Sequence, residues 1–357
     1  MKKLLLILVL ALVLARSLSA QEVRNEIAFP DVPGYVTLKC DFHMHTVFSD
    51  GDVWPPVRVE EAWRTGLDAI AITDHIEYQP HKDDVPTNHN RPFELARESA
   101  KERNIILIHA AEITRETPPG HYNALFLSDN AFIVADFPEC VHRANEQGAF
   151  VFWNHHTWKG AEAGRWTDTQ QKLYDAKRLH GLEVANGGTY YPDAHRWCIE
   201  KKMTMLGNSD IHDPDLRLKN TDADHRTVTL IFAKERAEAG IREALNERRT
   251  AVWVNDQLIG LEEVIAPLFR ECVKIEMPHY RGKDAWASVR NNSEMTIRLT
   301  RTDGPGPGTM TLKPRSVGLI RFRPPENAKT AMLKYIADNF LVEPGKGLPV
   351  AFEVELP

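Results

Sequence analysis

The sequence predicts an α/β fold, in which helices alternate with the strands of a parallel barrel, followed by a small β-rich domain. Short apolar runs typical of buried strands alternate with helix-like segments up to about residue 257. Beyond that point short alternating runs separated by turns replace them. The chain has 357 residues, which is too long for one ordinary hydrophobic core. These observations favour a barrel over residues 21–257 and a β-rich accessory domain over residues 258–357.

The first region contains a regular series of expected elements. We expect strands near 38–43, 69–73, 105–111, 124–127, 149–153, 181–185, 204–207, 227–233 and 251–254. We expect helices over 55–66, 94–104, 137–148, 169–179, 192–203 and 237–248. Gly66 and Gly148 stand where a glycine commonly ends a helix. Such repetition predicts parallel strands whose carboxyl ends open onto one face.

The second region lacks this alternation. Helix signals fade after residues 261–269, and alternating runs follow at 285–289, 295–299, 318–322 and 350–354. Turn-forming residues at 291–292 and 303–308 separate some of these runs. The pattern predicts a small β-sandwich. It carries no cluster of metal-ligand or nucleophile type, so we interpret it as an accessory domain that packs against the barrel.

Side chains of metal-ligand type gather where the expected strands stop. His43 and His45 are two residues apart, so on a strand they would point to one face. Five further groups follow: Asp74-His75, Glu112, His121, His155-His156 and Asp210-x-His212. Imidazoles and carboxylates are ligands that borderline divalent metals prefer. A lone histidine at a strand end is usually structural, but six such groups predict a metal cluster on one face of the barrel.

In this order the motifs resemble those of the polymerase and histidinol phosphatase (PHP) superfamily. They are His43-x-His45 with Ser49-Asp50-Gly51, Thr73-Asp74-His75, Glu112, His121, His155 and Asp210-x-His212. The resemblance covers roughly residues 35 to 255. It implies a distorted (β/α)7 barrel, phosphoester hydrolysis and two or three divalent ions per chain, with Zn, Mn and Fe all suited to the ligands.

The resemblance also implies how the ligands divide among the ions. His43, His45, Glu112 and Asp210 match one metal; Glu112 bridges to a second held by His121 and His155; Asp50, His75 and His212 match a third. The family usually has His-Pro where this chain has His155-His156, so His155 is our first choice and His156 stays open. We expect Asp74, Glu183 and Asn186 to orient ligands by hydrogen bonds.

The amino-terminal segment resembles a secretory signal peptide over residues 1–20. Lys2 and Lys3 precede a short apolar stretch, and small residues near Ala20 suit cleavage. The stretch is too short for a membrane anchor, so we expect a periplasmic or secreted protein without membrane attachment after cleavage. The formal net charge is −6, and loss of Lys2, Lys3 and Arg16 lowers it to −9. Such an acidic chain is unsuited to binding polynucleotides. The sequence does not indicate an oligomeric state.

The chemistry expected at such a centre needs no serine or cysteine nucleophile. Clustered cations lower the pKa of a coordinated water, so that hydroxide forms near neutral pH, and neutralise phosphoryl oxygens. Residues that could protonate the leaving group are His81, His156 and His225. Candidate phosphate contacts are Arg115, Tyr122, Lys159, Arg217 and Arg226.

Four hypotheses on function follow. The first is a secreted phosphodiesterase acting on small organic diesters, because the opening 30–35 and the signal peptide resemble a secreted PHP subgroup. The second is a phosphomonoesterase acting on sugar or nucleotide phosphates. The third is a non-catalytic metal- or glycan-binding protein, against which the full ligand set speaks. The fourth is an amidohydrolase-type barrel, which typically adds a bridging Lys and a single late Asp, whereas this chain has Thr-Asp-His and Asp-x-His.

Overall fold

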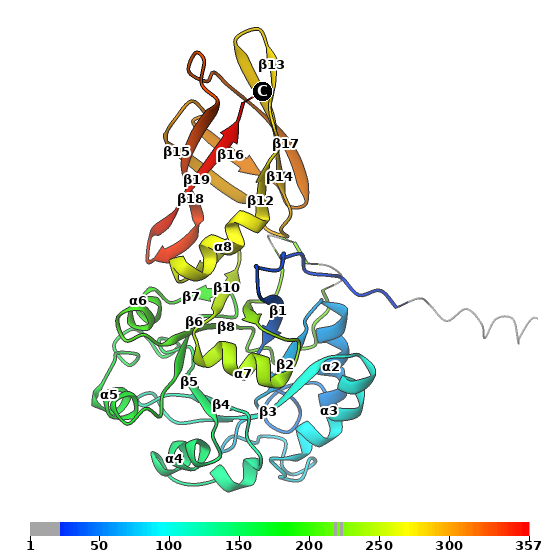
Figure 1. The fold of residues 1–357 in the computed structure, drawn as a ribbon. Coiled ribbons are helices and arrows are strands. Elements are labelled where there is room, and N and C mark those ends of the chain that lie inside the picture. The colour runs from blue at the N-terminus through cyan, green and yellow to red at the C-terminus, as the bar shows by residue number, and fades with distance from the viewer. Residues whose placement is uncertain (1–21, 218–219, 222–223, 357) are drawn as a thin grey trace, which may run out of the picture.

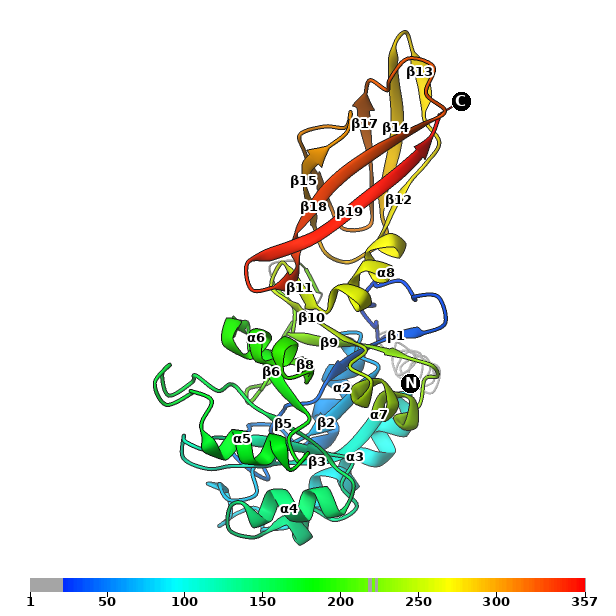
Figure 2. The same ribbon diagram turned by 60° about the vertical axis from the view of Figure 1, so that its left-hand side comes forward.

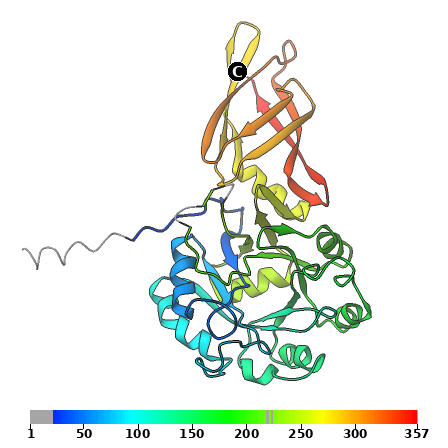
Figure 3. The same ribbon diagram turned by 180° about the vertical axis from the view of Figure 1, so that it is seen from behind.

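The computed structural model describes residues 22–217, 220–221 and 224–356. The segment expected to be a signal peptide lies outside these ranges. The molecule consists of an α/β barrel and a β domain stacked end to end, with helix α8 (Glu262–Cys272) between them (Figure 1). The same stacking is seen from the side and from behind (Figures 2 and 3). Within the described residues no helix is both long and apolar enough to cross a bilayer.

The barrel region contains all nine strands and all six helices that the sequence predicts, with ends shifted by a few residues. The strands are β1 (Val36–Asp41), β2 (Ala69–Ile72), β3 (Ile106–Ile113), β4 (Tyr122–Leu125), β5 (Phe150–Trp153), β6 (Gly181–Asn186), β8 (Thr204–Asn208), β9 (Val228–Ala233) and β10 (Thr250–Val254), with two short additions, β7 (Thr189–Tyr190) and β11 (Gln257–Gly260). The helices are α2 (Pro55–Arg64), α3 (Arg91–Glu102), α4 (Glu139–Glu146), α5 (Asp168–Asp175), α6 (Pro192–Glu200) and α7 (Glu238–Asn246), and a 3-10 turn, η1, spans Asn130–Ile133. The predicted alternation of elements is therefore confirmed.

The sheet is mixed rather than wholly parallel. β1 pairs with β2, β2 with β3, β5 with β6 and β6 with β8 in parallel, as expected. β4 lies antiparallel between β3 and β5, and β9 lies antiparallel between β1 and β10. The loop between β3 and β4 is too short for a parallel crossover, which needs about a dozen residues or more. Because β4 is reversed, its amino end lies at the same edge as the carboxyl ends of β3 and β5.

The β domain consists of two sheets, as predicted for a sandwich. One contains β12 (Val273–Ile275), β13 (His279–Arg281), β14 (Asp284–Asn291) and β17 (Ser316–Phe322); the other contains β15 (Ile297–Asp303), β16 (Thr309–Leu312), β18 (Thr330–Glu343) and β19 (Lys346–Glu355). β18, the long strand of this domain, was not anticipated. Buried residues alternate with exposed ones along it at Ala331, Leu333 and Tyr335, and this alternation was the available signal.

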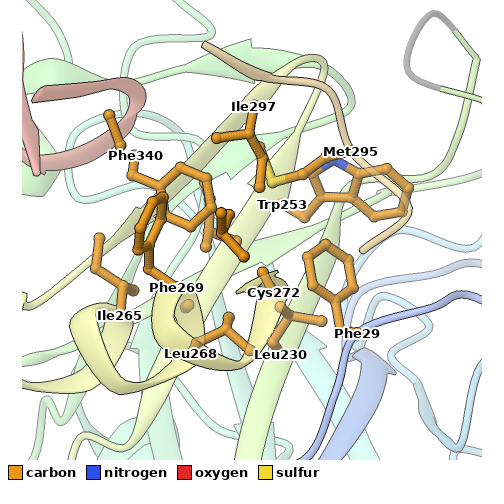
Figure 4. Close-up of a cluster of buried hydrophobic side chains, with 14 of the residues drawn as sticks. Phe29, Leu230, Trp253, Ile265, Leu268, Phe269, Cys272, Met295, Ile297 and Phe340 are labelled. Carbon is orange, nitrogen blue, oxygen red and sulfur yellow. The ribbon is translucent and has the colours of Figure 1, made fainter. Parts of the chain in front are cut away.

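The two domains share a hydrophobic core at their junction (Figure 4). Phe29, Leu230 and Trp253 enter it from the barrel side. Helix α8 adds Phe269, whose ring meets Phe340 of β18 edge-on with centroids 5.3 Å apart. A hydrogen-bonded sheet also runs from one domain into the other, because β11 pairs in parallel with the end of β18. The β domain therefore packs on the barrel through apolar burial and a shared sheet.

Candidate metal centre

The predicted ligands lie around one cavity at the edge of the barrel where the parallel strands end. The cavity has a volume of about 1200 Å³. Its lining includes Asp50, His75, His121, His155, Asp210 and His212. His43, His45 and Glu112 lie beneath them and are fully buried. His121 reaches this edge because it immediately precedes the reversed strand β4.

The two histidines after β1 point to the same pair of carboxylates. His43 Nε2 lies 3.1 Å from Asp210 Oδ1 and 3.4 Å from Glu112 Oε1. His45 Nε2 lies 3.0 Å from the same Asp210 oxygen and 3.6 Å from Glu112 Oε2. Asp210 adopts a left-handed backbone conformation with φ of 52°, which aspartate tolerates better than most residues. These four residues are the set that the resemblance implied for one metal.

Glu112 also lies beside the histidines expected at a second metal. Its Oε1 is 3.1 Å from His121 Nδ1 and 3.7 Å from His155 Nε2. The two imidazole rings have centroids 5.0 Å apart. The neighbouring His156 points away: its Nδ1 lies 2.7 Å from the carbonyl oxygen of Gly164. The structure therefore brings His155, and not His156, to the cluster.

A third group forms around Asp50. Its Oδ1 lies 3.3 Å from His212 Nε2, 3.5 Å from His75 Nε2 and 3.6 Å from His45 Nδ1. The loop that carries Asp50 turns tightly over the end of β1, and a Cβ at Gly51 would lie 2.5 Å from the carbonyl carbon of His45. Glycine is therefore required after Asp50 for the loop to pack so closely.

The donor set fits divalent cations. Within the described part of the chain, the buried atoms His43 Nε2, Glu112 Oε2 and Asp50 Oδ1 have no hydrogen-bond partner. Burying ionised carboxylates in this way is costly unless a cation or several donors compensate. Four overlapping groups of ligand atoms, each within 4.8 Å, offer sites for ions. These atoms belong to residues of those groups, so metals bound there would compensate them.

The pKa value of each ionisable group in the cluster depends on the charges of its neighbours. Burial would raise the pKa of Glu112, but His75 and His43 hold it well below its usual range. Burial disfavours the charged form of His75, yet Glu112 and Asp50 outweigh this and raise its pKa to about 10. The pKa of His45 falls to about 3 because of its burial and of His75 nearby. Without a metal, protons on some imidazoles therefore balance the carboxylates.

Glu183 orients ligands from beneath the cluster, as the sequence analysis expected. Its Oε1 accepts hydrogen bonds from His43 Nδ1 and Asn208 Nδ2, both at 2.9 Å. Its Oε2 accepts from the backbone nitrogen of His155 and from Asn186 Nδ2, also at 2.9 Å. A carboxylate on Nδ1 leaves Nε2 of His43 free to bind a metal and makes it more basic.

Asp74 acts less directly than Glu183. It accepts hydrogen bonds from Ser49 Oγ and from the backbone nitrogen of Thr46, both at 2.7 Å. Ser49 Oγ in turn lies 3.3 Å from His45 Nδ1. Asp74 thus fixes the loop after β1 and reaches the ligand histidine through a hydroxyl group.

Two buried arginines fix the ligand-bearing loops, and sequence reasoning missed one of them. Arg58 donates to the carbonyl oxygen of His45 at 2.8 Å and to those of three consecutive residues, 211–213. It pairs with Glu61 three residues later on α2, on the face of the helix that also buries Val59 and Ala62. An Arg–Glu pair among the apolar positions of a helix was the signal for this role.

Arg226 was expected to contact phosphate, and this expectation is corrected. Its side chain is buried and pairs with Asp215 at 2.8 Å, Asp41 at 3.3 Å and Glu61 at 3.5 Å. It lines only a smaller neighbouring cavity of about 360 Å³. Three carboxylates already use this guanidinium, so its role is structural.

The structure does not bring the tentative acids to the main cavity. His156 packs against Trp197, with ring centroids 4.9 Å apart. His225 stacks on Trp253 at 3.5 Å and has a carbonyl oxygen near each ring nitrogen. His81 lines neither cavity described here. None of these three positions supports protonation of a leaving group.

Of the remaining phosphate-contact candidates, two line the main cavity, one lines the smaller cavity and Tyr122 lines neither. Arg115 and Lys159 line the main cavity, but Arg115 forms an ion pair with Glu77 and donates to the carbonyl oxygen of Ala135 at 2.7 Å. Arg217 lines the smaller cavity and pairs with Asp215 at 2.9 Å. Tyr122 is buried, with its hydroxyl donating to a backbone carbonyl. Only Arg115 and Lys159 thus remain near the ligands.

Comparison with known proteins identifies the class. A PHP domain model matches residues 41–189, and an Ig-like domain model matches residues 273–353. A solved two-domain protein from Bacteroides vulgatus, containing a predicted PHP-like metal-dependent phosphoesterase, is 45% identical with a TM-score of 0.88; the match covers 94% of this chain and 100% of that one. The chain belongs to this PHP family of metal-dependent phosphoesterases, so the predicted family and fold class are confirmed.

Two weaker matches do not bear on the substrate. An uncharacterized protein of Methanocaldococcus jannaschii is 36% identical over 83 residues, which cover 23% of this chain and only 36% of that protein. A lesion-specific endonuclease from Pyrococcus furiosus is 15% identical, with 63% of this chain and 59% of that one covered and a TM-score of 0.42.

Proposed function

We propose that this protein is an exported metal-dependent phosphodiesterase that acts on small organic phosphate diesters. The observation that carries the proposal is the convergence of nine metal-ligand side chains on one open cavity, with several buried ligand atoms that lack hydrogen-bond partners. Membership of a family of metal-dependent phosphoesterases supports the reaction class. The choice of diesters and the export of the protein go beyond these observations and need their own tests.

The residues of the chain have separable tasks. His43, His45, Asp50, His75, Glu112, His121, His155, Asp210 and His212 would hold the ions. Divalent ions, when bound, supply positive charge for the phosphoryl oxygens and a water of lowered pKa. Glu183 holds His43 in the tautomer with a free Nε2. Arg58 holds the loops after β1 and β8 together through hydrogen bonds to their carbonyl oxygens.

The charges of the cavity favour a diester over a monoester. Among the described residues that line it, the permanently cationic side chains are Arg115 and Lys159, and Glu77 neutralises the first. Glu116 and Asp136 add negative charge to the same lining. Recognition of a dianionic monoester usually recruits a cluster of arginine or lysine residues. A monoanionic diester needs less positive charge beyond that of the ions.

The proposal is tested with matched aryl substrates. Metal-free protein is reconstituted separately with Zn, Mn and Fe, and kcat/KM is measured for bis(p-nitrophenyl) phosphate and p-nitrophenyl phosphate. We expect faster hydrolysis of the diester. A clear preference for the monoester would favour the phosphomonoesterase hypothesis, and no turnover with any metal would favour a binding protein.

Export and the absence of a polynucleotide substrate are tested independently. Residues 1–20 and the net charge of −9 without them support both proposals. Amino-terminal sequencing of protein from a periplasmic fraction should begin near Gln21. Single-stranded and duplex DNA should bind weakly at low salt, where electrostatic attraction is strongest. Full-length protein in the cytoplasm, or tight DNA binding, would contradict these proposals.

A further inference from the structure

Two exposed aromatic side chains stand at the mouth of the main cavity. Trp158, in the loop after β5, is 50% exposed, and Tyr78, in the loop after β2, is 52% exposed. Both line the cavity. The backbone nitrogen of Trp158 donates to the carbonyl oxygen of His155 at 3.0 Å, so a turn fixes the indole close to a ligand.

Both rings lie next to the metal-ligand histidines. The centroid of the Trp158 ring is 5.4 Å from that of His121 and 5.9 Å from that of His155. The Tyr78 ring is 5.9 Å from that of His75. A group attached to a phosphoryl centre at the cluster would therefore lie close to an aromatic side chain. Apolar surface kept exposed at such a place favours a binding role.

The surroundings of these rings combine apolar surface with a lysine that lies over the indole. The Nζ of Lys159 lies 4.0 Å from the centroid of the Trp158 ring, so its charge is placed over an aromatic face. Val134, Ala135 and Ile76 contribute apolar surface to the same lining. Arg115, the arginine among the described residues that line the cavity, is paired with Glu77 and is therefore not free to bind a second anionic group.

We propose that Trp158 and Tyr78 form an aromatic subsite, which binds the ring of an aryl or heteroaryl phosphoester while its phosphoryl group lies at the ligand cluster. The inference rests on the proposed function only in taking the ligand to be a phosphoryl compound. Stacking on an indole contributes through apolar burial and through the preferred offset or edge-on geometry of aromatic rings. The subsite makes Trp158 and Tyr78 determinants of specificity and gives them no part in the bond-breaking step.

The test measures binding of two ligands that cannot be hydrolysed as esters. Phenylphosphonate and methylphosphonate carry the same phosphonate group and differ in the aromatic ring. Isothermal titration of the metal-loaded full chain should give roughly tenfold tighter binding of phenylphosphonate. Trp158→Ala should remove most of this ratio, whereas Trp158→Phe should keep most of it. Trp54→Ala, which removes another indole that is 52% exposed but does not line the cavity, should leave the ratio unchanged.

The outcomes separate the subsite from the reaction. Equal affinities for the two ligands in the unaltered protein, or an equal loss of both in Trp158→Ala with metal content retained, would overturn the proposal. If Trp158→Ala fails to fold, Tyr78→Ala provides the same comparison from the other side of the cavity. A normal preference for phenylphosphonate in a protein that hydrolyses no diester would reject the proposed function and leave the subsite standing.

Discussion

Two buried clusters of charge lie on either side of the segment 209–215, and they are satisfied in opposite ways. In one, the guanidinium groups of Arg58 and Arg226 meet the carboxylates of Asp41, Glu61 and Asp215. In the other, imidazoles and carboxylates face the cavity and several of their atoms lack hydrogen-bond partners. The first cluster contains its own permanent cations. The second cluster relies on imidazoles for positive charge, and the charge of an imidazole depends on pH.

The difference indicates how this protein separates the residues that fix its loops from those that could bind metal. The arginine cluster fixes the backbone of Ile211, His212 and Asp213, next to Asp210, and contains both the cations and the carboxylates of its ion pairs. The histidine cluster is left with orphaned donor atoms that a divalent ion can bind. A loop held on its buried side can therefore present ligands on its other side without rearranging. Four changes test this interpretation.

The largest effect is expected from Asp210→Asn. The amide keeps the shape and the tolerance for a positive φ but removes a charge shared by His43 and His45. We expect activity to fall by about a thousandfold or more, since an interaction with the reacting centre is lost, together with metal content measured by elemental analysis. Asp213→Asn, at an exposed position three residues away, is the matched control and should be silent. A fully active Asp210→Asn enzyme would refute the assignment.

Arg226→Met should have the largest effect on stability. It leaves Asp41 buried without its paired cation, while Asp215 and Glu61 keep only Arg217 and Arg58, and this costs about 3–5 kcal/mol of unfolding free energy. Urea unfolding followed by circular dichroism measures the loss. Arg165→Met is the control, because that side chain is 67% exposed and should change stability by less than about 0.5 kcal/mol. Equal free energies of unfolding for the two variants would show that the buried cluster does not stabilise the fold.

A smaller effect is expected from Glu183→Gln, which alters the hydrogen bonds that support the histidine cluster from beneath. Glutamine keeps the volume but cannot accept all four hydrogen bonds that the carboxylate accepts. Metal affinity should fall by about 10- to 100-fold, as competition with a chelator would measure, while the unfolding transition of the metal-free protein persists. Glu98→Gln, with a side chain that is 73% exposed, is the control. An unchanged metal affinity would show that Glu183 contributes only to packing.

The smallest effect concerns pH. In the metal-free protein Glu112 and Asp50 raise the pKa of His75 to about 10 despite its burial. The stability from its proton is present below the ordinary value of 6.5 and is lost as the pH rises towards 10. Metal and proton compete for the imidazole, so the gap in melting temperature between metal-loaded and metal-free protein should widen over this range. Thermal unfolding of both forms checks this, and a constant gap would contradict it.

The sequence predicted the elements of the fold well because each barrel strand is a short apolar run that ends at a polar residue. Strand direction was harder to predict. The apolar run of β4 looks the same in either direction, and only the short loop after β3 indicates that it is reversed. In the β domain, β18 was missed because its alternation of buried and exposed residues stops at Asn339, after which residues up to Val342 are all buried.

The candidate ligands could be predicted because they are ionisable residues in short, ordered motifs. All nine lie around the cavity, although which ions they hold remains a prediction. Arg58, by contrast, binds backbone carbonyl oxygens distant in sequence, and no motif records such contacts. His156 and His225 look suitable as acids by residue type, but ring packing against Trp197 and Trp253 decides where they point.

The pairing of β11 with β18 gives the boundary between the domains an unusual character. β18 extends from the outer end of the β domain to the barrel, where Phe340 and Leu341 lie opposite Leu258 and Ile259 (Figure 2). A chain cut at this boundary would leave β11 as a bare sheet edge beside Trp253, and open hydrophobic edges invite aggregation. For protein engineering, the β domain should therefore be kept together with the barrel, because it covers a sheet edge that the barrel leaves open.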